Sequence, residues 1–247
     1  MRYGVISDIH SNIEAFEAAL DRLTREKVDK YIFCGDLIGY GPDPKACIDL
    51  YGSLVKKDLV QGVLGNHDGI VVHPELQAYF HPEALKVLEW TLKQLSPQDM
   101  RVVSFLPAVV RGSKFMVVHG TPRDPLKEYF VNTNQYHALY DEWKGQILFI
   151  GHSHIPFYMS GNEKRCKIHL IHEEHMVVLM EKARYVINPG SVGRPRDNNP
   201  LASFGVWDTS TQEFLFLREE YDWEKTQRKM RKAGIPGNLT ETLSMGL

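Results

Sequence analysis

Cysteine is scarce in this sequence of 247 residues, and the three cysteines form no C-x-x-C pair. A zinc ribbon and a thioredoxin-like motif are therefore excluded. An odd and sparse set of cysteines also argues against a disulfide framework and is typical of free thiols in a reducing cytosol. The three are Cys34, Cys47 and Cys166.

Long apolar runs and an excess of charge of one sign are missing too. No run approaches the length of a membrane span, and the start, MRYGVISDIHSN, has no basic and apolar signal segment. We therefore expect a cytoplasmic protein with no membrane partner. Lys and Arg number 29 against 31 Asp and Glu, so polymeric nucleic acid is not a favoured partner. A small phosphorylated ligand stays compatible, because one site can be basic on a neutral protein.

Short apolar runs and amphipathic segments alternate along the first half of the chain. The near-continuous apolar character of these runs predicts strands that are covered on both faces. Helices are predicted at 12–26, with a Ser11–Glu14 capping box, from Pro44 to about residue 52, and at 82–95. This order predicts a largely parallel sheet. The predicted strands are 3–7, 31–35, 60–66, 115–120, 147–151 and 185–190.

The second half is organised differently. Residues 167–187 fit a strand or a helix, a hairpin is expected across 210–212, and a last amphipathic helix should end at Gly234. No internal repeat, low-complexity segment or composition break marks a linker. We therefore expect a single domain, 1–247.

Polar, ligand-type side chains come at or directly after the ends of five of the six predicted strands. In an open α/β sheet, ligands collect outside the carboxyl ends of the strands, so these side chains are expected to share one crevice. Residues two apart on extended backbone point the same way, which lets His152 and His154 reach one ion. The residues concerned are Asp8, His10, Asp36, Asn66, His67, Asp68, His119, His152 and His154.

This set offers oxygen and nitrogen ligands without thiolate, which suits manganese, iron or zinc better than calcium. The residue types do not decide between these metals. Seven candidate ligands exceed the needs of one tetrahedral ion, whereas two ions that share a carboxylate would use them all. Two divalent ions about 3.5–4 Å apart form a clamp for phosphoryl displacement.

Five blocks, SDIHSN, GDLIGYG, GNHD, VHG and GHSH, resemble in order the motifs of the calcineurin-like metallophosphoesterases. NPGSVGRPRD (188–197) is similar to the small bacterial and archaeal branch, which includes phosphodiesterases and diadenosine-tetraphosphatase-like enzymes. The resemblance implies an α/β fold, a four-layer αββα sandwich of two mixed β-sheets flanked by helices. It also implies a dinuclear centre in which a hydroxide shared by the metals attacks phosphorus.

Residue roles follow from the resemblance by motif position. Asp36 would bridge the two ions, and His67 would act as general acid. The first metal would be bound by Asp8, His10, Asp36 and His154, and the second by Asp36, Asn66, His119 and His152.

The chain departs from the protein Ser/Thr phosphatases in the second block. Their second acid and arginine correspond here to Gly39 and Tyr40, which argues against phosphoprotein substrates and leaves His67 without an orienting partner. Arg194 and Arg196 are candidates for binding phosphate, or are solvated or salt-bridged residues of a loop. Asn12 is a helix-start residue or a substrate contact. Tyr40 and Asp68 are read as structural, and His169, His172 and His175 lie outside the blocks.

We therefore expect hydrolysis of a nucleotide-like phosphodiester or dinucleoside polyphosphate, with substrate contacts from loops 40–44, 122–133 and 190–200. Two alternatives stay open at this point. One is a phosphomonoesterase or protein phosphatase of the same fold, and the other is a non-catalytic scaffold, as in a retromer subunit. A homodimer is compatible with the exposed face of the late hairpin.

Overall fold

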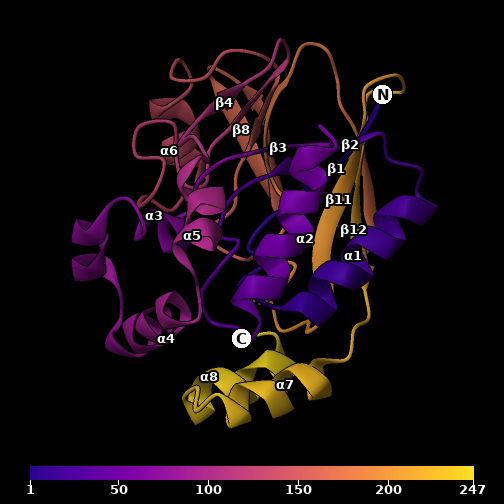
Figure 1. Ribbon diagram of the computed structural model, residues 1–247. Coiled ribbons are helices and arrows are strands. Elements are labelled where there is room, and N and C mark those ends of the chain that lie inside the picture. The colour runs from indigo at the N-terminus through magenta and orange to yellow at the C-terminus, as the bar shows by residue number, and fades with distance from the viewer.

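The computed structural model describes residues 1–247 as two six-stranded sheets that pack face to face, with helices on the outside (Figure 1). The strand orders are β3-β2-β1-β11-β12-β9 and β4-β5-β6-β10-β7-β8. Each sheet contains parallel and antiparallel pairs, so both are mixed. The predicted four-layer αββα sandwich is confirmed.

The first sheet begins with three parallel strands that come from the front of the chain. The later strands add to it in antiparallel orientation, and β11 and β12 form the expected hairpin. Its strands are β1 (Arg2–Ile6), β2 (Lys30–Phe33), β3 (Val60–Gly62), β11 (Ala202–Asp208), β12 (Glu213–Glu219) and β9 (His175–Val178).

The second sheet has three parallel strands at its centre and antiparallel strands at both edges. The segment 167–187, which fitted a strand or a helix, contributes strands to both sheets. The strands of the second sheet are β4 (Val110–Arg111), β5 (Phe115–Val117), β6 (Ile147–Phe149), β10 (Arg184–Asn188), β7 (Phe157–Asn162) and β8 (Arg165–Leu170).

Both faces of the central strands are buried, which explains their continuous apolar sequence. Val5 points into the core between the sheets, while its neighbour Ile6 packs against the helices of the first sheet. On β6, Phe149 points into the same core and Leu148 points to the outside layer. This is the alternation that a strand imposes on successive side chains.

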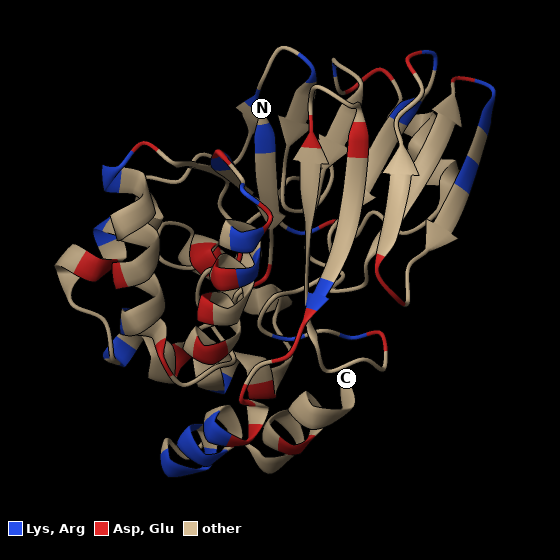
Figure 2. Ribbon diagram, turned by 90° about the vertical axis from the view of Figure 1, so that its right-hand side faces the viewer, with Lys and Arg blue, Asp and Glu red and all other residues tan.

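Helices α1 (Ile13–Arg25) and α2 (Pro44–Lys56) cover the first sheet, and α6 (Thr133–Ala138) covers the second. In Figure 2 the charged residues lie mainly on helices and at loop ends, and basic residues gather on α7. No helix is both long and apolar enough to cross a membrane. The remaining helices are α3 (Asn66–Gly69), η1 (Pro74–Tyr79), α4 (Pro82–Lys93), α5 (Pro97–Ser104), α7 (Trp223–Lys232), α8 (Gly237–Glu241) and η2 (Thr242–Met245).

The predicted capping box of α1 was wrong. Asn12 is the N-cap, and its side-chain oxygen accepts from the Ala15 N–H at 3.2 Å. Ser11 adopts a left-handed backbone with φ of 53°. Glu14 turns away from the helix start, because its carboxylate pairs with Lys229 at 2.7 Å. Tertiary contact with α7 therefore outweighs the local capping pattern.

Candidate metal centre and the cavity above it

Four buried side chains converge at the carboxyl ends of three strands. Asp8 and His10 follow β1, Asp36 follows β2, and His154 follows β6. One ligand-type atom from each lies within 4.8 Å of the others, and all four residues are buried. Residues up to 146 positions apart in sequence thus form one cluster, as the strand-end argument predicted.

The backbone of this cluster is unusual. Asp8, His10, Asp36, His152 and His154 all have positive φ, between 49° and 68°. For residues other than glycine the left-handed region costs about 1–3 kcal/mol per residue, and it persists where the surrounding structure imposes it, often at functional sites. The strained turns after β1, β2 and β6 therefore lower the free energy of unfolding, and in return they direct these side chains toward one point.

The ring nitrogens of His10 and His154 face each other. Nδ1 of His10 is 3.1 Å from the Ile38 carbonyl, and Nδ1 of His154 is 2.6 Å from the Arg194 carbonyl. Because a carbonyl only accepts, both Nδ1 atoms donate, and the Nε2 atoms carry the lone pairs of the neutral rings. The two Nε2 atoms are 3.0 Å apart. Two lone pairs at this separation repel unless a cation binds them.

The two carboxylates each leave one oxygen without a hydrogen bond. Asp8 Oδ2 accepts from Ser7 and from the His152 N–H, and Asp36 Oδ1 accepts from the His67 N–H at 2.9 Å. Asp8 Oδ1 and Asp36 Oδ2 are buried and have no donor. Both lie near Nε2 of His10, at 3.7 Å and 3.6 Å. Buried carboxylate oxygens without donors are costly unless a cation compensates them.

A second group shares Asp36. Nε2 of His119 lies 3.2 Å from Asp36 Oδ2 and 3.1 Å from Asn66 Oδ1, while its Nδ1 is 2.8 Å from the Cys34 carbonyl. The ring centroid of His152 is 4.8 Å from that of His119. His152 Nε2 is 3.3 Å from the Lys127 carbonyl, which leaves its Nδ1 as the free ring nitrogen.

The electrostatics of this second group favour positive charge. Burial disfavours a charged ring at His119, but the Asp36 carboxylate outweighs burial and raises the pKa of His119 to about 9. Burial raises the pKa of Asp36, and the nearby histidines His119 and His67 more than reverse this and lower it far below its ordinary value. Divalent metal ions fit this site for three reasons. Two carboxylate oxygens have no donor, two ring nitrogens direct their lone pairs at each other, and the electrostatics favour a cation.

His67 lies at the start of α3, beside the ligand-type residues. Its ring is buried, and its Nδ1 has no hydrogen-bond partner. Gly39 leaves the space for this nitrogen, because a Cβ at residue 39 would lie 2.2 Å from it. Burial lowers the pKa of His67 well below its ordinary value, although Asp36 opposes this. The predicted lack of an orienting partner on the Nδ1 side is what the structure shows.

Asp68 is structural, as expected. Its carboxylate accepts from the N–H groups of Leu37 at 2.9 Å and Ile38 at 3.1 Å, and from Gly65 at 3.2 Å. Asp68 thereby links the turn that contains Asp36 to the turn that contains Asn66. Burial, followed by the neighbouring Asp36, raises the pKa of Asp68 to about 6.

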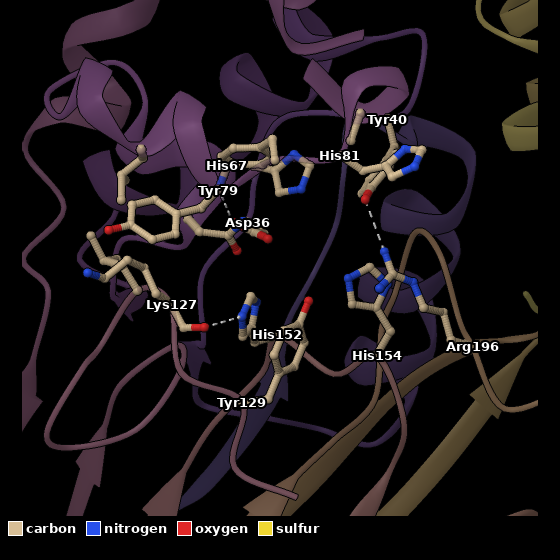
Figure 3. Close-up of a pocket in the computed structure, with 15 residues that line it drawn as sticks. Asp36, Tyr40, His67, Tyr79, His81, Lys127, Tyr129, His152, His154 and Arg196 are labelled. Atoms are coloured by element: carbon tan, nitrogen blue, oxygen red, sulfur yellow. Dashed lines mark hydrogen bonds between the residues drawn. The ribbon is translucent and has the colours of Figure 1, made fainter. Parts of the chain in front are cut away.

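A cavity of about 390 Å³ opens over these residues (Figure 3). The expected loops contribute Tyr40, Lys127, Tyr129 and Arg196, and a segment that carried no motif, residues 76–84, forms the remaining wall. This part of the cavity wall was not predicted from the sequence, because the segment matches no motif and its aromatic residues are the only signal in it. The members from that segment are Leu76, Tyr79, Phe80, His81 and Ala84.

Arg196 enters the cavity next to Tyr40. Its guanidinium donates to the Tyr40 hydroxyl at 3.1 Å and forms no ion pair with a carboxylate. The Tyr40 ring in turn packs against His10 and His67, with centroid separations of 4.9 Å and 4.7 Å. Tyr40 is therefore part of the cavity, and its interpretation as a residue that only packs in a loop was incomplete. Arg196 offers the cavity an uncompensated positive charge.

Arg194 and Asn12 do not reach the cavity, which corrects two predicted substrate contacts. The Arg194 guanidinium is buried against the C-terminal segment, where it donates to the Leu239 carbonyl at 2.8 Å and to the Thr242 hydroxyl at 3.0 Å. The Asn12 amide donates to the Gly193 carbonyl at 2.9 Å, and its oxygen caps α1. Both side chains are used within the fold.

A larger hollow of about 920 Å³ lies between α2, β3 and α5. No aspartate, glutamate, histidine or cysteine lines it. His169, His172 and His175, the three histidines of the segment 167–187, also lie elsewhere, on β8, in the loop between β8 and β9, and on β9. Together with Glu173 and Glu174 they line a separate hollow of about 360 Å³, whereas the buried Asp/His cluster lies beneath the cavity above Asp36.

The sequence matches the calcineurin-like phosphoesterase superfamily domain over residues 1–212. The chain belongs to this superfamily. An uncharacterized protein of Methanocaldococcus jannaschii is 33% identical over 246 residues, which cover 98% of this chain and 97% of that one. The crystal structure of a metallophosphoesterase from Sphaerobacter thermophilus superposes with a TM-score of 0.87 at 33% identity, covering 100% and 99% of the two chains.

A shorter similarity links this superfamily member to a symmetrical bis(5'-nucleosyl)-tetraphosphatase of Buchnera aphidicola. The two are 36% identical over 98 residues, covering 34% of this chain and 35% of that one. Members of the superfamily are metal-dependent phosphoesterases, and the Asp/His cluster provides ligands of the type they need. Residues 213–247, including α7 and α8, lie beyond the family match.

Proposed function

We propose that this protein is a phosphoesterase with two divalent metal ions that hydrolyses phosphodiester or phosphoanhydride bonds of nucleotide-like substrates. The observation that carries the proposal is that two groups of ligand-type side chains share Asp36 Oδ2 beneath a cavity with an unpaired guanidinium. The partial similarity to a bis(5'-nucleosyl)-tetraphosphatase supports the nucleotide-like substrate.

Asp36 would be the ligand that the two ions share. The ions would supply a water activated at neutral pH and would screen the charge of the phosphoryl oxygens. Manganese, iron and zinc all suit these ligands. One ion would be bound by Asp8, His10, Asp36 and His154, and the other by Asp36, Asn66, His119 and His152.

Arg196 and His67 would act on the substrate itself. The Arg196 guanidinium can form paired hydrogen bonds to a phosphoryl group, and the Tyr40 hydroxyl limits its freedom beforehand. His67 lines the cavity beside Asp36 and would donate a proton to the leaving oxygen as general acid. The protein Ser/Thr phosphatases have an arginine in the second block, at the position of Tyr40. Here Arg196, from the loop 190–200, would provide that positive charge.

A substrate panel tests the proposed function. Metal-stripped protein is reconstituted with manganese, zinc, iron or magnesium and assayed with bis-p-nitrophenyl phosphate, p-nitrophenyl phosphate and diadenosine tetraphosphate. We expect at least one ion to restore turnover of the diester or the tetraphosphate above that of the monoester. Dominant monoester turnover would favour the phosphomonoesterase alternative, and absence of turnover with every ion would favour a scaffold.

Gly39→Ala should damage the position of His67 without removing a metal ligand. Residue 39 has φ of 94°, and its new Cβ would lie 2.2 Å from His67 Nδ1, so the ring must move. General acid catalysis contributes about 10²–10⁴-fold, and we expect kcat to fall roughly 10- to 100-fold. Metal content, measured by plasma emission spectroscopy, should stay unchanged. Gly52→Ala is the matched control, because no atom lies within 4 Å of its Cβ position.

Divalent metal should stabilise the fold, because the cluster it would bind exists only in the native state. At a free metal concentration of 100 times Kd, the expected gain is about 2.7 kcal/mol. For a chain of this size that corresponds to a rise in Tm of about 5–10 °C. Differential scanning calorimetry with and without chelator measures the shift. A Tm that stays unchanged with every divalent ion tested would contradict a native metal site.

A further inference from the structure

One end of the cavity is built from segments outside the five motif blocks. Figure 3 shows Tyr79 and Lys127 on one side of Asp36 and His152, with Arg196 and Tyr40 on the other side. The metal ligands thus lie between two ends that each combine a cation with an aromatic ring. A substrate with its phosphoryl group over Asp36 has room to extend toward the Tyr79 end.

The aromatic rings at this end are open to solvent. Tyr79 is 69% exposed and Tyr129 is 46% exposed, although both line the cavity. The Tyr129 ring lies flat on His152, with centroids 3.7 Å apart and planes 15° apart. Tyr79 has no aromatic partner of this kind, so its ring is available to a ligand. Stacking of a nucleobase on an aromatic side chain contributes about 1–3 kcal/mol.

Lys127 brings a positive charge to the same place. Its ammonium lies 4.8 Å from the centroid of the Tyr79 ring. Its backbone carbonyl is 3.3 Å from His152 Nε2, which ties the residue to the metal ligands. The nearest carboxylate oxygen, on Asp124, is 3.5 Å from Nζ, and both side chains are more than a third exposed. Such an exposed pair is weak, so the ammonium can exchange this partner for a ligand anion.

We propose that Tyr79 and Lys127 form a subsite for a nucleoside phosphate leaving group. The base stacks on Tyr79, and the phosphate beyond the bond to be broken binds Lys127. Leu76 and Leu126, which line the same cavity, contact the apolar parts. This inference rests on the proposed function and narrows the substrate to a phosphoanhydride of a nucleotide.

The reaction balances as a hydrolysis. The oxygen of water bonds to phosphorus, and the anhydride P–O bond breaks with its electron pair on the oxygen of the departing nucleoside phosphate. One proton of the water remains on the new phosphate oxygen and the other is released or taken up by the leaving group. Lys127 offsets the negative charge that this leaving group gains.

Binding of adenosine diphosphate, a product-like probe, tests the subsite without turnover. Isothermal titration calorimetry is run on full-length protein with no divalent ion added. We expect Tyr79→Ala and Lys127→Met each to weaken the Kd about tenfold, while Tyr79→Phe, which keeps the ring, stays within about twofold. Adenosine should respond only to Tyr79→Ala, and pyrophosphate only to Lys127→Met.

Phe105→Ala and Lys57→Met are the matched controls, because both residues are exposed and lie outside this cavity. Parent-like binding of adenosine diphosphate by Tyr79→Ala and Lys127→Met overturns the inference, as does an equal loss with Tyr79→Phe. If the parent hydrolyses diesters while the variants bind normally, the subsite fails and the proposed function stands. If the parent hydrolyses nothing while Tyr79→Ala weakens binding, the proposed function fails instead.

Discussion

Asp36→Asn should abolish turnover while the protein stays folded. The amide oxygen can still accept from the His67 N–H, as Asp36 Oδ1 does at 2.9 Å. The amide NH₂ would replace Oδ2, which faces Nε2 of His10 and of His119 at 3.6 Å and 3.2 Å. An NH₂ group donates to these nitrogens and cannot bind a cation. Loss of an outer partner of a metal ligand costs 10- to 100-fold, so loss of the shared ligand should cost at least about 100-fold in kcat/KM.

The measurement pairs kinetics on the best substrate of the panel with metal content by plasma emission spectroscopy. Asp21→Asn makes the same chemical change on an exposed position of α1 and should leave both unchanged. In the absence of metal, Asp36→Asn should melt somewhat earlier than the parent, because it removes the carboxylate that lies 3.2 Å from the His119 ring and raises its pKa. Parent-like metal content and turnover in Asp36→Asn would refute the shared carboxylate.

Phe149→Ala should produce a large loss of stability. Phe149 lies in the core between the sheets, fully buried, with ring centroids 6.2 Å from Phe115, 5.6 Å from Trp207 and 6.0 Å from Phe214. Removing a buried phenyl ring loses its transfer free energy and leaves a cavity, at a cost of about 3–5 kcal/mol. Urea denaturation of the metal-free protein measures the change in the free energy of unfolding.

Phe105→Ala is the comparison for that experiment. Phe105 is 84% exposed at the end of α5, so its loss should stay within about 0.5 kcal/mol. A cost below about 1 kcal/mol for Phe149→Ala would mean that the two sheets do not share a tightly packed core.

The convergence of Asp8, His10, Asp36 and His154 could be predicted because strand ends are defined by local pattern. An apolar run, a small residue and a polar side chain place Asp8 and Asp36 at one edge of the first sheet, where β1 and β2 are parallel. His154 follows β6 of the second sheet, and the packing of the two sheets brings it to the same cluster. The roles of these residues stay predictions until metal content and turnover are measured. The single-domain assignment also stays a prediction.

The cavity walls could not be predicted in the same way. Tyr79 is the last residue of a short 3-10 helix, η1, and Phe80 follows it; the placement of Phe80 against His67 depends on tertiary packing. Arg194 and Arg196 are two residues apart in one loop, yet one is buried against η2 and the other enters the cavity. Their chemistry is the same, so only the path of the backbone separates their roles. The capping box failed for the same reason, because Lys229, more than 200 positions away, pairs with Glu14.

The carboxyl end of the chain has a practical bearing on how the protein is produced. Thr242 and Leu239 accept from Arg194, and the carbonyl of Arg194 accepts from His154. Shortening the chain before α8 would remove both acceptors and free the loop behind His154. Affinity tags and fusion partners are therefore better attached at the amino terminus, which lies at the other end of the molecule (Figure 1).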